Sequence, residues 1–147
     1  MAHTGLSLFD TTVQKTNIWV NDLAAKLGWE NRHDVFQALR TTLHALRDRI
    51  PPEEAVHLGA QLPILLSGFF YENYQLANTP TKERTKEAFL GKVQEDLQRT
   101  NIEAQAEPVV RAVFALIAEH VTPGETMDVA QSFPQELKYL WPEAVRA

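Results

Sequence analysis

The sequence predicts an all-α fold of eight helices in two similar four-helix repeats. Apolar residues recur every three or four positions in most long segments, which is the spacing of one helix face. No segment combines the alternation of a strand with the turn residues of a hairpin. The pattern of prolines and apolar positions also recurs about 71 residues further along the chain.

Long apolar stripes predict the first two helices. The first helix ends at Gly28, because glycine suits the residue that follows a helix C-terminus. The second is entered through Asn31 and is stopped by Pro51 and Pro52. The two stripes are Val13, Trp19, Val20, Leu23 and Leu27, and then Val35, Leu39, Leu43, Leu46 and Ile50.

Two shorter helices and a connector complete the first half. A third helix spans residues 52–62, and Pro63 opens a fourth that runs to about Tyr74, since proline fits the first turn of a helix. Residues 77–82 are polar around a central proline and read as a connector. We therefore predict a first repeat at residues 1–76 and a second at residues 77–147, which together form one compact domain.

The second half repeats this order of elements. Apolar stripes mark the fifth and sixth helices, the seventh helix spans residues 123–133 and the eighth spans residues 134–141. The stripes are Phe89, Leu90, Val93 and Leu97, and then Val110, Val113, Phe114, Ile117 and Val121. Residues identical at an offset of 71 are Arg40 and Arg111, Pro52 and Pro123, Glu54 and Glu125, Pro63 and Pro134, and Leu66 and Leu137. A fused duplication of this kind predicts packing about a pseudo-two-fold axis.

Composition restricts the classes of function. The 147 residues are 44% hydrophobic and 22% charged, as in an ordinary globular protein. There is no cysteine, which excludes disulfide bonds and thiolate chemistry and is typical of a reducing compartment. The first ten residues lack the basic and apolar regions of a signal peptide, and no apolar stretch is long enough to span a membrane. We expect a cytoplasmic protein.

The charge argues against a nucleic-acid partner. The formal net charge is −5, and acidic residues outnumber basic residues in both halves. Nucleic-acid binding depends on clustered Lys and Arg that neutralise phosphates, so we expect none here.

Motifs in the two halves resemble a known family. The first half contains Ala60-Gln61-Leu62-Pro63-Ile64-Leu65-Leu66, followed by Gly68-Phe69-Phe70-Tyr71-Glu72. The second half echoes this with Phe133-Pro134-Gln135-Glu136-Leu137 and then Leu140-Trp141-Pro142. Over about residues 10–142 the sequence resembles the bacterial domain of unknown function 2267 family (DUF2267). The resemblance implies a bacterial cytoplasmic helical protein, and it implies no activity and no catalytic residues.

A pair of acidic motifs at the starts of helices three and seven is the sharpest candidate for chemistry. Glu54-Ala-Val-His57 is an E-x-x-H motif, and its equivalent in the second half is Glu125-Thr-Met-Asp128. Residues three apart share a helix face, so each motif could offer two ligands to the metal of a metal-dependent enzyme.

Helix capping is the interpretation that we favour for the same residues. Thr122 would be the N-cap, Pro123 the first helical residue and Glu125 the third, whose carboxylate can reach the N-cap amide. Glu54 occupies the same place after Pro52. Capping accounts for the glutamates, the prolines and their spacing in both halves without further ligands. We therefore predict no metal and no cofactor.

The fourth helix is apolar on all sides rather than along one stripe. A helix of this kind is either buried in the core or covered by a partner. We predict that Phe69 and Phe70 are both largely buried, in the core or by a neighbouring chain. An interface or an apolar pocket lined by Phe69, Phe70, Tyr71 and Tyr74 is the alternative to a purely structural role.

Together these features favour a non-enzymatic helical interaction or accessory protein, which associates with a protein partner or with itself. Two alternatives stay open. One is a binding module for a small apolar ligand in a cleft between the repeats. The other is a metal-dependent enzyme at Glu54 and His57 together with Glu125 and Asp128.

Overall fold

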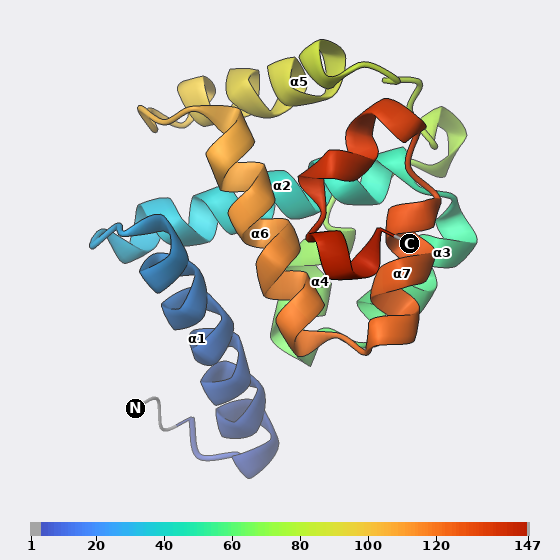
Figure 1. The fold of residues 1–147 in the computed structure, drawn as a ribbon. Helices are drawn as coiled ribbons and strands as arrows, with labels where there is room; N and C mark the ends of the chain where they lie inside the picture. Colours follow the sequence, from blue (N-terminus) through green and yellow to red (C-terminus); the bar gives the residue numbers. More distant parts are fainter. Residues whose placement is uncertain (1–3, 147) are drawn as a thin grey trace.

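The computed structural model describes residues 4–146, and within this range every regular element is helical. None of the described helices is long and apolar enough to cross a membrane. In the described residues the eighth predicted helix is a 3-10 helix, and two further short 3-10 helices are additions to the prediction. The order of elements (Figure 1) is α1 (Ser7–Leu27), α2 (Arg32–Arg49), α3 (Pro52–Gly59), α4 (Ile64–Tyr71), η1 (Leu76–Asn78), α5 (Lys86–Arg99), α6 (Ala106–His120), α7 (Pro123–Gln131), η2 (Gln135–Leu140) and η3 (Glu143–Val145). The all-α prediction is confirmed.

Local chemistry explains where these helices begin and end. The Asn31 side chain caps α2, because it accepts a hydrogen bond from the backbone amide of Asp34 (3.2 Å). Gly28 ends α1 with a positive φ of 71°, a conformation that suits glycine. Pro52 is the first residue of α3 and Pro123 is the first residue of α7. These boundary residues therefore act as the sequence indicates, although α3 ends at Gly59 and α7 at Gln131, before the predicted residues 62 and 133.

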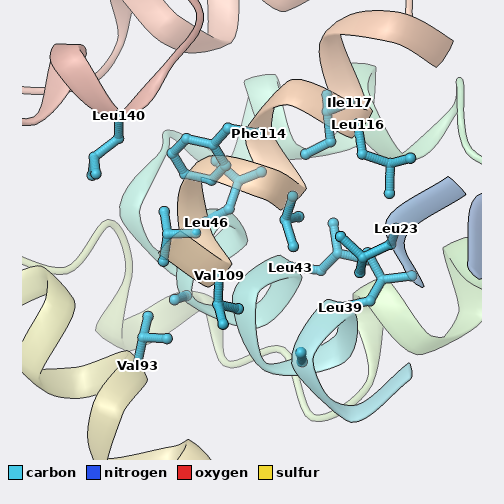
Figure 2. Close-up of a cluster of buried hydrophobic side chains, with 14 of the residues drawn as sticks. Leu23, Leu39, Leu43, Leu46, Val93, Val109, Phe114, Leu116, Ile117 and Leu140 are labelled. Atoms are coloured by element: carbon cyan, nitrogen blue, oxygen red, sulfur yellow. The ribbon is translucent and has the colours of Figure 1, made fainter. Parts of the chain in front are cut away.

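The centre of the core lies where α2 and α6 cross. Figure 2 shows buried side chains of α2 packed against those of α6, with Leu23 of α1 and Val93 of α5 at the edges of the cluster. Helices α1 and α5 each contact both α2 and α6. To one side of this centre, α3 and α7 contact each other (Figure 1). This last contact brings together the two acidic motifs of the sequence.

Helix α4 is shorter than predicted and is only partly covered. It ends at Tyr71 rather than near Tyr74, and Asn73 takes a positive φ of 57° that no helix continues through. Leu66 and Phe70 are fully buried in the core. Ile64, in contrast, is 82% exposed, and Leu65 beside it is also exposed. One side of this apolar helix therefore faces outward.

Candidate functional site

Glu54 and Glu125 meet across the contact between α3 and α7. Each is the third residue of its helix, so each side chain projects from a first turn toward the neighbouring helix. The two carboxyl groups lie close enough to share a hydrogen bond when one of them holds a proton. Glu54 is half-buried, whereas Glu125 is only 9% exposed. The structure thus joins the two acidic motifs into one carboxyl pair.

The capping interpretation holds for Thr122 but not for either glutamate side chain. The Thr122 hydroxyl oxygen accepts a hydrogen bond from the backbone amide of Glu125 (3.4 Å), as expected of an N-cap. The Thr122 amide donates to Oε1 of Gln61 (2.9 Å), so the reciprocal bond to the Glu125 carboxylate is not formed. At the other helix the N-cap is Pro51, which has no N–H for Glu54 to accept. Neither carboxylate completes a capping box.

Burial and charge both act on Glu125. Its pKa is raised to about 8, first because burial disfavours the charged form, and then because of its hydrogen bond to Glu54 and the negative charges of Glu54 and Asp128. One oxygen of each glutamate, Oε2, is buried without a hydrogen-bond partner in the described part of the chain. A proton shared by the pair removes one of the two negative charges at neutral pH.

His57 completes a group of three possible metal ligands. Its Nδ1 lies 3.9 Å from Oε2 of Glu54, and one ligand atom each from Glu54, His57 and Glu125 lie within 4.8 Å of one another. Asp128, the fourth residue of the two motifs, is exposed and lies outside this group. The structure therefore brings together three of the four sequence candidates.

A second surface is formed by the first turns of α1 and the start of α4. Leu8 and Phe9 of α1 are 82% and 56% exposed, and Ile64 and Leu65 lie at the start of α4. The Leu65 amide donates to the hydroxyl oxygen of Thr12 (2.9 Å), one turn after Leu8, which holds the two helices together at this point. We call Leu8, Phe9, Ile64 and Leu65 the apolar end of α1. In Figure 1 these first turns project beyond the other helices.

The apolar end of α1 continues a stripe that is buried further along the same helix. Leu8 and Phe9 precede Trp19 and Val20 by about three helical turns, so they lie on the same side of α1. Trp19 and Val20 are buried against the rest of the fold. Leu8 and Phe9 are not among the residues predicted from sequence, although the spacing that continues the stripe identifies them.

An open hollow lies beside this surface. It has a volume of ≈ 660 Å³ and lies between α1, the start of α2 and α4. Its apolar wall is Val20, Phe36, Leu65 and Phe69, and polar side chains such as Asn17 and Arg32 rim it. All of these residues belong to the first half of the chain. A binding site for an apolar ligand between the two halves stays a prediction.

The four aromatic residues proposed from sequence lie in different surroundings. Phe70 is fully buried, whereas Phe69 is half-buried and contacts Phe36 edge to face (4.9 Å between ring centroids). The Tyr71 hydroxyl lies 3.4 Å from the carbonyl oxygen of Ala55 on α3. The Tyr74 ring packs under the guanidinium of Arg47, whose carbon lies 4.9 Å from the ring centroid. Of the four, only Phe69 reaches the hollow.

The buried end of α4 is fixed by basic side chains of α2. The Arg47 guanidinium donates to the Phe70 carbonyl oxygen (2.9 Å) and to that of Glu72 (2.5 Å). Arg40 forms a bidentate pair with the Glu72 carboxylate (2.8 and 2.6 Å). These contacts hold the C-terminal end of α4 against the core and leave its first turn as the outward-facing part.

Comparison with known proteins gives a family. No curated protein matches the chain. The family of uncharacterised conserved proteins termed DUF2267 matches residues 16–140, which include the core helices and both acidic motifs. The chain therefore belongs to the DUF2267 family.

Proposed function

We propose that this chain is a non-enzymatic helical interaction protein, which associates with a second copy of itself through the apolar end of α1. The observation that carries the proposal is that the core-facing apolar stripe of α1 continues into solvent-exposed residues at the start of the helix. Single exposed apolar side chains are common on protein surfaces. Here four of them, Leu8, Phe9, Ile64 and Leu65, lie on two helices that a hydrogen bond holds together. Exposed apolar side chains gathered on two bonded helices are a candidate interaction site.

The shape of this region supports a second copy as the partner. Leu65 belongs both to the apolar end of α1 and to the wall of the hollow, together with Val20, Phe36 and Phe69, so the helix end and the hollow adjoin each other. In a two-fold dimer each copy can place its helix end against the hollow of the other, so both surfaces are covered at once. Such closed, self-complementary contacts are the commonest form of oligomer.

Sedimentation velocity over a range of protein concentrations tests the proposal. The wild-type chain should shift from monomer to dimer as concentration rises. Leu8→Ser and Ile64→Ser should weaken this dimer by at least tenfold, because each removes a large apolar side chain from the contact. Leu76→Ser is the control, since Leu76 is also an exposed leucine (59%) but lies on η1. A monomer at all concentrations, or equal weakening by Leu76→Ser, contradicts the proposal.

We also propose that the chain is two diverged four-helix repeats, residues 1–76 and 77–147, related by a pseudo-two-fold axis within one domain. Reciprocal contacts support this. Helix α1 contacts α6, and its expected equivalent α5 contacts α2. Equivalent helices that lie beside such an axis are expected to contact each other. Two equivalent pairs do so: α2 contacts α6, and α3 contacts α7. Pro63 and Pro134 immediately precede α4 and η2, the elements expected to correspond.

Composition and resemblance support the setting of this function. We propose that the protein works in a bacterial cytoplasm, in keeping with the family resemblance and with a chain free of cysteine. The net charge of −5 supports a protein partner rather than a nucleic acid.

A further inference from the structure

We propose that Glu54, His57 and Glu125 form a binding site for one divalent transition-metal ion at the contact between α3 and α7. This inference goes beyond the proposed self-association, because it concerns a different part of the molecule. It rests on three observations: the convergence of three ligand residues, the lack of donors for the buried carboxylate oxygens, and the position of the histidine at the open side of the pair.

The first observation is the convergence of ligands from two helices. Glu54 and His57 stand three residues apart on α3, so they share one face, and Glu125 approaches from α7. Their ligand atoms lie within 4.8 Å of one another. A metal ion about 2.0 to 2.2 Å from each ligand brings such atoms to roughly 3 to 4 Å. The Nδ1 atom of His57 already lies 3.9 Å from Oε2 of Glu54, so only small side-chain movements are needed.

The second observation is the lack of donors for the carboxylate oxygens. Glu125 is only 9% exposed, and its Oε2 has no hydrogen-bond partner among residues 4–146. Oε2 of Glu54 is in the same situation. Buried polar atoms are rarely left in this state, because desolvation without a partner is costly. A divalent cation between the two carboxylates would satisfy both oxygens, and on binding it would displace the proton that the pair otherwise shares.

The ligand set indicates the class of ion. An imidazole nitrogen suits Zn²⁺ and Fe²⁺, whereas carboxylates also suit Mn²⁺; Mg²⁺ and Ca²⁺ prefer oxygen ligands alone. His57 is exposed and lies on the solvent side of the pair, so the imidazole can rotate onto an ion without disturbing the core. Three protein ligands leave at least one coordination position for water.

A second acidic group in the fold shows the contrast. Asp22, Glu119 and His120 also place three ligand atoms within 4.8 Å of one another. There, however, His120 Nε2 is bonded to the Asp22 carboxylate (2.8 Å), and Glu119 is paired with Lys26 (2.5 Å). A lysine ammonium already pairs with one carboxylate of this group, and the imidazole pairs with the other. It therefore supplies a control rather than a site.

Thermal unfolding and calorimetric titration test the proposal on metal-free protein. With Zn²⁺ or Mn²⁺ at about a hundred times the dissociation constant, the melting temperature should rise by roughly 5 to 10 °C. Calorimetric titration should give one bound Zn²⁺ or Mn²⁺ per chain. Mg²⁺ should have little effect on the melting temperature. Glu125→Gln and His57→Ala should each abolish the shift and weaken binding at least tenfold. Two control variants should leave the metal-induced shift and the metal affinity unchanged. They are Glu53→Gln, next to the pair on α3, and Asp22→Asn, in the second group.

The variants separate loss of metal from loss of fold. Gln keeps the shape of Glu125 and can donate a hydrogen bond to Glu54, so Glu125→Gln should remain folded without metal. His57 is at the surface, and replacing it should leave the metal-free melting temperature nearly unchanged. No shift with either Zn²⁺ or Mn²⁺ in the wild-type chain would overturn the proposal. A shift that survives in Glu125→Gln or in His57→Ala would overturn it as well.

Discussion

The carboxyl groups of Glu54 and Glu125, which belong to helices far apart in the chain, face each other across the contact between α3 and α7. Each keeps one buried oxygen without a donor in the described residues. A first prediction follows from the raised pKa of Glu125, which burial and the neighbouring Glu54 bring to about 8. Below the unfolded pKa, near 4.5, both states hold the proton; between about 4.5 and 8 only the folded state holds it.

The sign of the pH dependence is therefore fixed. In metal-free protein the stability contributed by Glu125 is fully present below pH 4.5 and is lost as pH rises from there to about 8, by at most about 1.4 kcal/mol per pH unit. Glu125→Gln has no such proton to lose. Urea unfolding should give similar stabilities for the two proteins near pH 5 and a more stable Glu125→Gln at pH 8.5. If the wild-type chain were the more stable one at pH 8.5, the pairing of the carboxyls would be wrong.

The second prediction concerns the N-cap of α7. Thr122→Ala removes the oxygen that accepts from the Glu125 amide, and with it a contact to Gln61, whose Nε2 donates to Thr122 (3.1 Å). The free energy of unfolding should fall by about 0.5 to 2 kcal/mol. Thr122→Ser keeps the hydroxyl and should cost much less. Equal losses in the two variants would show that the methyl group, rather than the cap, matters.

These two sites show how far the sequence can be read. Prolines and the threonine identify the starts of α3 and α7, because local chemistry alone sets a helix end. The pairing of Glu54 with Glu125 depends on how α3 packs against α7, which no local pattern specifies. Gln61, which lies in the connection after α3, likewise accepts the hydrogen bond of the Thr122 amide. Local patterns therefore favour a capping role for the two carboxylates, although each carboxylate finds its partner across the fold.

The same distinction applies to α1 and α4. Spacing predicts which side chains share a helix face. It does not predict which part of that face the other helices cover. Trp19 is covered and Leu8 is not, although both belong to one stripe. On α4 the all-round apolar surface predicted either burial or a partner; Phe70 is buried in the core, and Ile64 is open.

The third prediction concerns Phe70, which is fully buried against its neighbours. Phe70→Ala should lower the free energy of unfolding by roughly 3 to 5 kcal/mol, because a large cavity is left in the core. Because Phe69 is only half-buried, Phe69→Ala should lower the free energy of unfolding by distinctly less. Chemical denaturation of both variants measures the difference. A smaller loss for Phe70→Ala than for Phe69→Ala would contradict the packing described for α4.

The fourth prediction uses two helical glycines. A Cβ on Gly59 would lie 2.1 Å from the Tyr71 hydroxyl oxygen, so Gly59→Ala must displace that ring and should destabilise the protein by about 1 to 3 kcal/mol. A Cβ on Gly91, within α5, would meet nothing within 4 Å. Gly91→Ala should therefore stabilise the chain by up to about 1 kcal/mol. Thermal unfolding should move the two melting temperatures in opposite directions, and a shift in the same direction would refute the close contact of α3 with Tyr71.

The central claim is that a second copy covers the apolar end of α1, and thiol labelling tests it most directly. The natural chain has no cysteine, so Leu8→Cys introduces a single reactive group at the proposed contact. Its labelling rate should fall as protein concentration rises through the monomer–dimer midpoint of that variant, while Leu76→Cys should react at the same rate throughout. A Leu8→Cys thiol that reacts equally fast at every concentration would contradict the account.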